Sequence, residues 1–127
     1  MIAEIFEFNR EILGEDPRQM VLPLDLPVEE WLIAALKEEV REYEDANNLA
    51  EKVDALIDLC YFAVGGLAKL GLDENKVHMC FQAVHKANMT KKPGIKATRP
   101  NDGSVVDAIK DETFQDPTER IKEIING

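Results

Sequence analysis

The chain has 127 residues, of which 45% are hydrophobic, and its formal net charge at pH 7 is -10. This length corresponds to one ordinary domain whose core is small, so association between copies would add stability. The acidic charge leaves no basic surplus for the phosphate backbone of DNA or RNA, and we therefore expect no nucleic-acid partner. The prediction is a single self-associating domain over residues 1–127.

The cysteines and the N-terminus indicate the compartment. Cys60 and Cys80 each lie in an apolar helical run and form no metal-binding or disulfide pattern, which favours reduced cysteines inside a cell. Glu4 and Glu7 make the amphipathic N-terminal segment unlike a secretory signal. No segment approaches the ~18 consecutive apolar residues that span a bilayer. We expect a cytoplasmic protein that has no membrane partner.

Apolar residues recur at helical spacing in the first part of the chain. They predict a helix over residues 2–12 that ends near Gly14, with Asp16-Pro17 just beyond it. The proline-containing stretch MVLPLDLP separates this helix from a second run of apolar residues at spacings of three and four. That run predicts a helix that begins at Val28, becomes polar at its far end and stops at Asn47-Asn48.

The most apolar run of the chain, LAEKVDALIDLCYFAVGGLAKLG, predicts the central helix, which begins at Leu49 and ends at a C-cap on Gly71. Gly65 and Gly66 each cost this helix roughly 1 kcal/mol relative to alanine. Close packing against another helix would explain them. Asp73 is the predicted N-cap of a fourth helix, ENKVHMCFQAVHKANM, which ends near the KKPG that follows.

The last third of the chain is rich in loops. Asn101-Asp102-Gly103 predicts a tight turn, and residues 104–106 a short extended piece. Asp116, Pro117 and Glu119 have the residue types of an N-cap, N1 and N3, and they open a last helix through RIKEIIN. The predicted fold is therefore all-α, an antiparallel helical bundle that assembles as a homo-oligomer and has a loop-rich C-terminal third.

Carboxylates gather on the second and third helices. They are Glu38, Glu39, Glu42, Glu51, Asp54 and Asp58. Glutamates at the end of a surface helix usually form a solvated face. Asp58 is different because it lies between Ile57 and Leu59, where an unpaired carboxylate costs several kcal/mol or becomes protonated. A compensating group is expected beside it.

The spacing of the acids predicts what that group is. Residues three, four and seven apart share one face of a helix. If Asn47-Asn48 is the apex of an antiparallel hairpin, residue 42 lies level with residue 53, and residue 38 with residue 57. The acids of the two helices then face each other, and the usual remedy for such repulsion is a hard divalent cation with oxygen ligands, Mg²⁺ or Mn²⁺.

The same residues resemble a known family. Glu38-Glu39-x-x-Glu42 followed by Glu51-x-x-Asp54 resembles the ExxE and ExxD signature of the all-α nucleoside triphosphate pyrophosphohydrolases, the superfamily of MazG, dimeric dUTPase and phosphoribosyl-ATP pyrophosphohydrolase. HKANMTKK and NDGSVV resemble the Asn-Met-Ser-Lys and Asp-Gly segments of the branch closest to phosphoribosyl-ATP pyrophosphohydrolase, which includes phage enzymes of the MazZ type. The resemblance implies a MazG-like bundle of two or four subunits. It also implies Mg²⁺-dependent cleavage between the α and β phosphates.

The second acid pair of this signature has two registers here. The gap between Glu42 and Glu51 is shorter than in most members, so the pair is either Glu51 with Asp54 or Asp54 with Asp58. The hairpin geometry favours Asp54 and Asp58 and leaves Glu51 peripheral, near the apex. The predicted metal ligands are Glu39, Glu42, Asp54 and Asp58, with Glu51 as the peripheral member.

Other polar residues are candidates for catalysis and substrate binding. Glu38 and Glu39 are the candidate general bases, because adjacent helical residues point about 100° apart and need not both bind metal. Asn88 can hydrogen-bond a base or ribose, and Lys91 and Lys92 can contact phosphate oxygens. The resemblance supports all three. Asp102 is a candidate for a loop that closes over the substrate, although turn chemistry alone also explains it. Trp31 is more typical of a core or interface than of a base-stacking platform.

The favoured function is a metal-dependent pyrophosphohydrolase whose partner is a nucleoside triphosphate substrate. A purine deoxynucleotide such as dGTP is one candidate. Phosphoribosyl-ATP hydrolysis is an alternative within the same enzyme class, and a non-catalytic, dimeric, acidic interaction module is an alternative outside it. The sequence leaves open the base, the sugar, the number of metal ions and the choice between homodimer and homotetramer.

Overall fold

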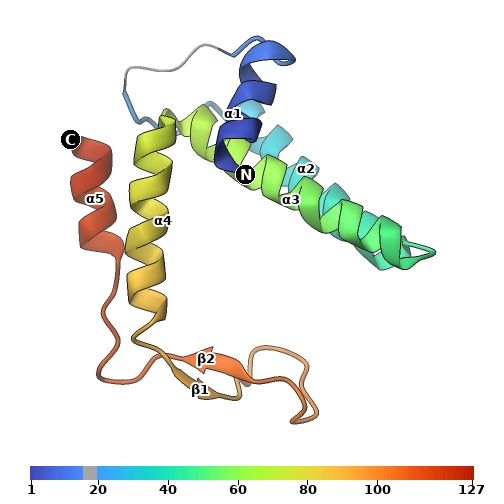
Figure 1. The fold of residues 1–127 in the computed structure, drawn as a ribbon, viewed down its shortest axis with the longest axis vertical. Coiled ribbons are helices and arrows are strands. Elements are labelled where there is room, and N and C mark those ends of the chain that lie inside the picture. The colour runs from blue at the N-terminus through green and yellow to red at the C-terminus, as the bar shows by residue number, and fades with distance from the viewer. Residues whose placement is uncertain (16–19) are drawn as a thin grey trace. The chain divides into compact units, whose positions relative to one another are not determined.

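The structure is a computed structural model, and it describes residues 1–15 and 20–127. Over these residues the chain forms helices and one small antiparallel sheet (Figure 1). In chain order the elements are α1 (Ile2–Glu11), α2 (Leu26–Asp45), α3 (Leu49–Leu70), α4 (Glu74–Asn88), β1 (Lys92–Gly94), β2 (Asp107–Ile109) and α5 (Thr118–Asn126). The predicted all-α class is confirmed. Asp16-Pro17, predicted to follow the first helix, lies outside the described residues.

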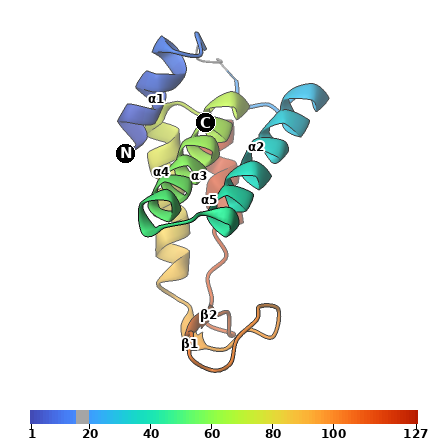
Figure 2. The same ribbon diagram turned by 90° about the vertical axis from the view of Figure 1, so that its right-hand side faces the viewer.

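The chain divides into two compact units, Met1–Val77 and His78–Gly127. In the first unit, α2 and α3 form an antiparallel hairpin, and α3 lies between α2 and α1 (Figure 2). The apex is where the sequence predicts it. The amide of Asn47 donates to Glu51 Oε2 at 2.8 Å, and the amide of Glu51 donates to Asn48 Oδ1 at 2.9 Å. These bonds satisfy backbone donors at the start of α3 and fix the turn.

Two glycines of the first unit have clear structural reasons. Gly71 ends α3 in the left-handed conformation, with φ of 107°, as its C-cap position predicts. Gly66 lies where α3 approaches α2, because a Cβ built there would be 2.8 Å from a methyl carbon of Leu32. The close packing expected from the glycine pair is therefore found within one chain at Gly66.

The core of the first unit is small, and much apolar surface remains uncovered. Its buried apolar residues are Ile5, Ala35, Ala55, Val64, Leu72 and Val77. Leu56 and Ile57 are 50% and 52% exposed, and Val53 and Val40 are similarly open. The helix around Asp58 is thus less enclosed within one chain than its apolar sequence suggests.

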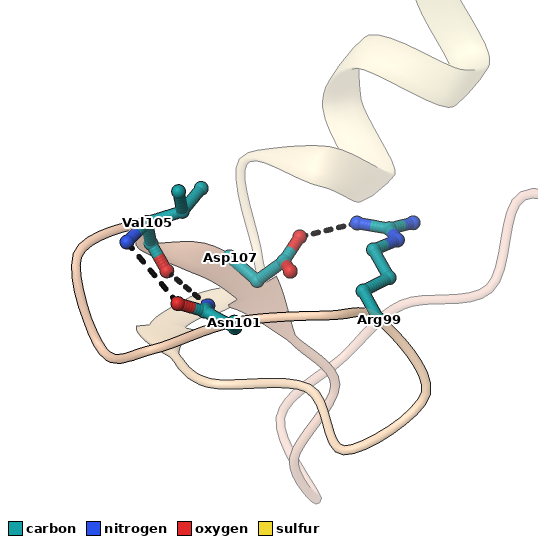
Figure 3. A network of polar contacts seen from close by, with 4 residues as sticks. All are labelled: Arg99, Asn101, Val105 and Asp107. Carbon is teal, nitrogen blue, oxygen red and sulfur yellow. Dashed lines mark hydrogen bonds and ion pairs between the residues drawn. The ribbon is translucent and has the colours of Figure 1, made fainter.

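The second unit contains the two-stranded sheet, and here part of the prediction was wrong. Residues 104–106, predicted as a short extended piece, lie in the connecting loop. β2 begins at Asp107, directly after them, and it pairs with β1 in a register that places Lys92 opposite Ile109 and Gly94 opposite Asp107. Both amide atoms of Asn101 bond the backbone of Val105, which holds that residue in the connecting turn (Figure 3). Arg99 forms an ion pair with Asp107 beside it.

The last two helices begin close to their predicted starts. Asp73 Oδ1 accepts a hydrogen bond from the amide of Lys76 at 2.8 Å, which confirms the cap of α4. The helix α5 begins at Thr118, one residue later than predicted, and Asp116 Oδ1 accepts from the amide of Thr118 at 2.7 Å.

Over the described residues, no single helix is long and apolar enough to cross a membrane. The helices α3 and α4 together have the length and composition of a membrane span, but only as a bent pair.

Candidate metal centre

Three acids of the first unit come together in space. Glu39 and Glu42 lie three residues apart on α2, and Asp58 approaches them from α3. One carboxylate oxygen from each residue lies within 4.8 Å of the other two. The spacing on α2 and the register of the hairpin produce this cluster, because residues three apart share a helix face and the short turn fixes which residues of α3 lie opposite.

Glu39 is the most strongly perturbed of the three. Its exposed fraction is only 7%, and no hydrogen-bond partner for its Oε2 exists among the described residues. The pKa of Glu39 is raised to about 7, first by burial and then by a hydrogen bond with Glu42 and the charges of Glu42, Asp58 and Glu38. A bound cation would stabilise a buried carboxylate oxygen that has no hydrogen-bond partner.

Asp58 is perturbed in the same direction. Burial is the largest cause of its raised pKa, and the neighbouring charges of Asp54 and Glu42 add to it. Without a cation, Glu39 and Asp58 therefore hold protons more tightly than free carboxyl groups do.

The remaining predicted acids surround the cluster without joining it. Glu38 and Asp54 are exposed, and each acts on a cluster member through its charge. Glu51 faces the hairpin apex, where its carboxylate accepts from Asn47. The hairpin register predicted from the sequence set Asp54 level with Glu42 and Asp58 level with Glu38, whereas the structure brings Asp58 close to Glu42. Of the predicted metal ligands, Glu39, Glu42 and Asp58 come together, and Asp54 and Glu51 lie outside this group.

The cluster fits a hard divalent ion. Its donors are all carboxylate oxygens, which Mg²⁺ and Mn²⁺ prefer over nitrogen and sulfur. The unpartnered Oε2 of Glu39 and the raised pKa values of two members show that the acids lack a positive partner within the described part of the chain. Exposed Glu42 leaves one side open to solvent and to a ligand.

A cavity of about 340 Å³ opens beside the acids. Glu39 and Asp58 line it together with other residues of α1, α2 and α3 and with Leu13, which follows α1. The other lining residues are Phe8, Asn9, Leu13, Trp31, Tyr61, Phe62, Gly65, Gly66 and Lys69. Those from α3 recur at spacings of three and four, so one helix face lines the cavity. Trp31 is 47% exposed, and it lies at this cavity and not in the core.

Asn9 is a cavity residue that was not predicted, although the sequence carries a signal for it. Asn9 follows Ile5 by four residues and therefore shares its inward face of α1, where a polar residue is unusual.

A comparison with protein families identifies the chain. The model of the phosphoribosyl-ATP pyrophosphohydrolase family matches residues 17–88, more than half of the sequence. The chain belongs to this family. It is therefore a nucleotide pyrophosphohydrolase of the MazG-like superfamily, which confirms the resemblance seen in the sequence. No match was found among curated proteins.

The pyrophosphohydrolase match contains all six acids and ends at Asn88. The predicted substrate residues Asn88, Lys91, Lys92 and Asp102 belong to the second unit, whereas the acids belong to the first. Asn88, Lys92 and Asp102 are exposed. Hydrogen bonds from Ser104 lower the pKa of Asp102, in keeping with turn chemistry. The Nζ atom of Lys91 lies 5.9 Å from the centre of the Phe114 ring.

Proposed function

We propose that this pyrophosphohydrolase is a divalent-metal-dependent enzyme that cleaves a nucleoside triphosphate between its α and β phosphates, giving a monophosphate and pyrophosphate. The observation that carries the proposal is the cluster of Glu39, Glu42 and Asp58, whose oxygens lie within 4.8 Å of one another inside the family match. A triphosphate carries about four negative charges, and a chain of net charge -10 would repel it without a cation.

Each acid has a proposed part. Glu39, Glu42 and Asp58 would hold Mg²⁺ or Mn²⁺. When bound, the ion neutralises phosphate oxygens and stabilises the charge that develops during an in-line displacement. Glu38 is the proposed acceptor of the proton from the attacking water, because it is adjacent to the cluster, exposed to solvent and outside the ligand group.

Four further polar residues have proposed contacts with the rest of the substrate. Asn88 offers a donor and an acceptor to the sugar or base, and Lys91 and Lys92 offer positive charge to the phosphates. Asp102 lies in the turn between β1 and β2, which we propose closes on the bound nucleotide. The exposure of Asn88, Lys92 and Asp102 leaves their polar groups available for these contacts.

A substrate panel tests the proposed function. Canonical and modified ribo- and deoxyribonucleoside triphosphates, with phosphoribosyl-ATP because the matching family is named for that substrate, are incubated with Mg²⁺ or Mn²⁺, and the products are resolved by chromatography. We expect at least one triphosphate to yield monophosphate and pyrophosphate, and only when metal is present. Release of orthophosphate alone, or turnover confined to phosphoribosyl-ATP, would contradict the proposal.

We also propose that the enzyme is a homodimer or homotetramer built around α2 and α3. The uncovered apolar side chains of these helices, among them Val40, Val53, Leu56 and Ile57, support it. Since burying such side chains is favourable, Ile57→Glu is expected to reduce the assembly to smaller species, while Glu7→Gln, on exposed α1 surface, leaves it intact. Light scattering at micromolar concentration measures both. A monomeric mass for the unaltered chain would contradict the proposal.

A further inference from the structure

The cavity beside the acids has one buried polar group that the acid cluster does not explain. Asn9 is 5% exposed, and its Nδ2 atom has no hydrogen-bond partner among the described residues. Burying an amide without a partner is unfavourable, so native proteins rarely retain one without a reason. Asn9 lines the same cavity as Glu39 and Asp58.

The amide of Asn9 packs against Gly65 of α3 at the wall of this cavity. A Cβ built on Gly65 would lie 3.4 Å from Asn9 Nδ2 and 3.7 Å from Asn9 Oδ1. The missing side chain at Gly65 therefore lets the amide lie close to α3. Gly66 differs, because its neighbour is Leu32 of α2. The absence of a side chain at Gly66 lets α2 and α3 pack closely.

Aromatic side chains form much of the wall of this cavity. Trp31 and Phe62 meet edge to face with ring centres 5.9 Å apart, and Phe8 and Tyr61 do the same at 5.5 Å. All four rings line the cavity. Aromatic walls around a few polar groups are typical of sites that take a flat, mostly apolar ring.

The position of the cavity relative to the acids points to one occupant. Gly65 follows Asp58 by seven residues on α3, a rise of about 10 Å along the helix. A nucleotide whose phosphates lie at the acids extends its sugar and base away from them, and the lining of the cavity extends from Asp58 to Gly65 along α3.

We propose that this cavity binds the heterocyclic base of the nucleotide and that Asn9 reads it, donating from Nδ2 to a ring nitrogen or carbonyl oxygen of the base. The proposal rests on the proposed function, since it places the phosphates at Glu39, Glu42 and Asp58. It assigns base selection to α1, which lies outside residues 17–88 of the family match.

The test replaces Asn9 with a side chain of similar size that cannot hydrogen-bond. For Asn9→Leu we expect kcat/KM for the preferred triphosphate to fall about tenfold or more, chiefly through KM, and the preference between bases to shrink. The melting temperature of the ligand-free protein should be unchanged or higher, because an unpartnered amide is removed. The rise in melting temperature that Mn²⁺ produces should persist.

A second variant and a control distinguish a loss of base binding from a loss of folding. Gly65→Ala places a methyl group against the Asn9 amide and favours the helix, so KM should rise without loss of stability. Ile5 is a buried residue of α1 that does not line the cavity. Ile5→Val removes one methylene group from the core and should leave base preference unchanged. Unaltered base preference and KM in both Asn9→Leu and Gly65→Ala would overturn the proposal. If the unaltered chain hydrolyses no nucleoside triphosphate, the proposed function fails and this proposal fails with it.

Discussion

Replacing Asp58 with asparagine is expected to abolish hydrolysis, with a fall in turnover of at least about 100-fold, and to raise the melting temperature of the metal-free protein. Asp58 is the one cluster member from α3, so its loss removes an anionic ligand that α2 does not supply. In the metal-free state the same change removes a carboxylate that Asp54 and Glu42 repel. Turnover with Mg²⁺ and melting curves in chelator measure the two effects.

Glu51→Gln is the matched control for Asp58→Asn. Glu51 is also an acid of α3, but its oxygen accepts from the amide of Asn47 at the apex, and a glutamine oxygen can accept the same bond. Both turnover and stability should therefore change little. If Glu51→Gln destroyed activity while Asp58→Asn retained it, the alternative register of the acid signature would be correct.

The second large effect concerns Glu39 and pH. The pKa of Glu39 is about 7 in the folded chain against 4.5 for a free glutamate, so between these values the folded protein keeps a proton that the unfolded chain has released. Protonation of Glu39 therefore contributes stability to the metal-free protein, and this contribution is fully present below pH 4.5. The contribution falls as the pH rises and is lost above about pH 7.

Glu39→Gln should remove most of this pH dependence, because glutamine does not titrate, and it should abolish hydrolysis as well. Between pH 5 and 8 we expect the melting temperature of the metal-free unaltered chain to fall by roughly 5 °C, and that of the variant to fall much less. Saturating Mn²⁺ should reduce the fall in the unaltered chain, since the bound ion favours the charged carboxylate. Equal slopes in the two metal-free proteins would assign the pH dependence to other groups.

The features of this fold that local chemistry determines were predictable from the sequence. Gly71 ends α3 and Asp73 caps α4 because few residues satisfy helix ends, and those residues are recognisable in a sequence. The hairpin apex was predictable for the same reason, and with it the fact that the acids of α2 and α3 face each other, although not which of them meet. A short, well-defined turn converts sequence spacing into spatial register.

The features that depend on long-range packing were not predictable. Glu38 and Glu39 are adjacent and chemically alike, and only the packing of α2 against its neighbours buries one and exposes the other. The strand β1 was missed because KPG has no strand signal of its own and becomes extended through its pairing with residues 107–109. The cavity requires α1, α2 and α3 together, so neither Asn9 nor Gly65 could be assigned to it from spacing alone.

Calorimetric titration of the protein with Mn²⁺ measures metal binding by the acid cluster without a substrate or turnover. We expect saturable binding to the unaltered chain and to Glu51→Gln. For Glu39→Gln and Asp58→Asn we expect binding at least about tenfold weaker, or none, since each loses a carboxylate of the cluster. Equal affinity in all four proteins, or no binding to the unaltered chain at millimolar Mn²⁺, would show that Glu39, Glu42 and Asp58 do not form the metal site.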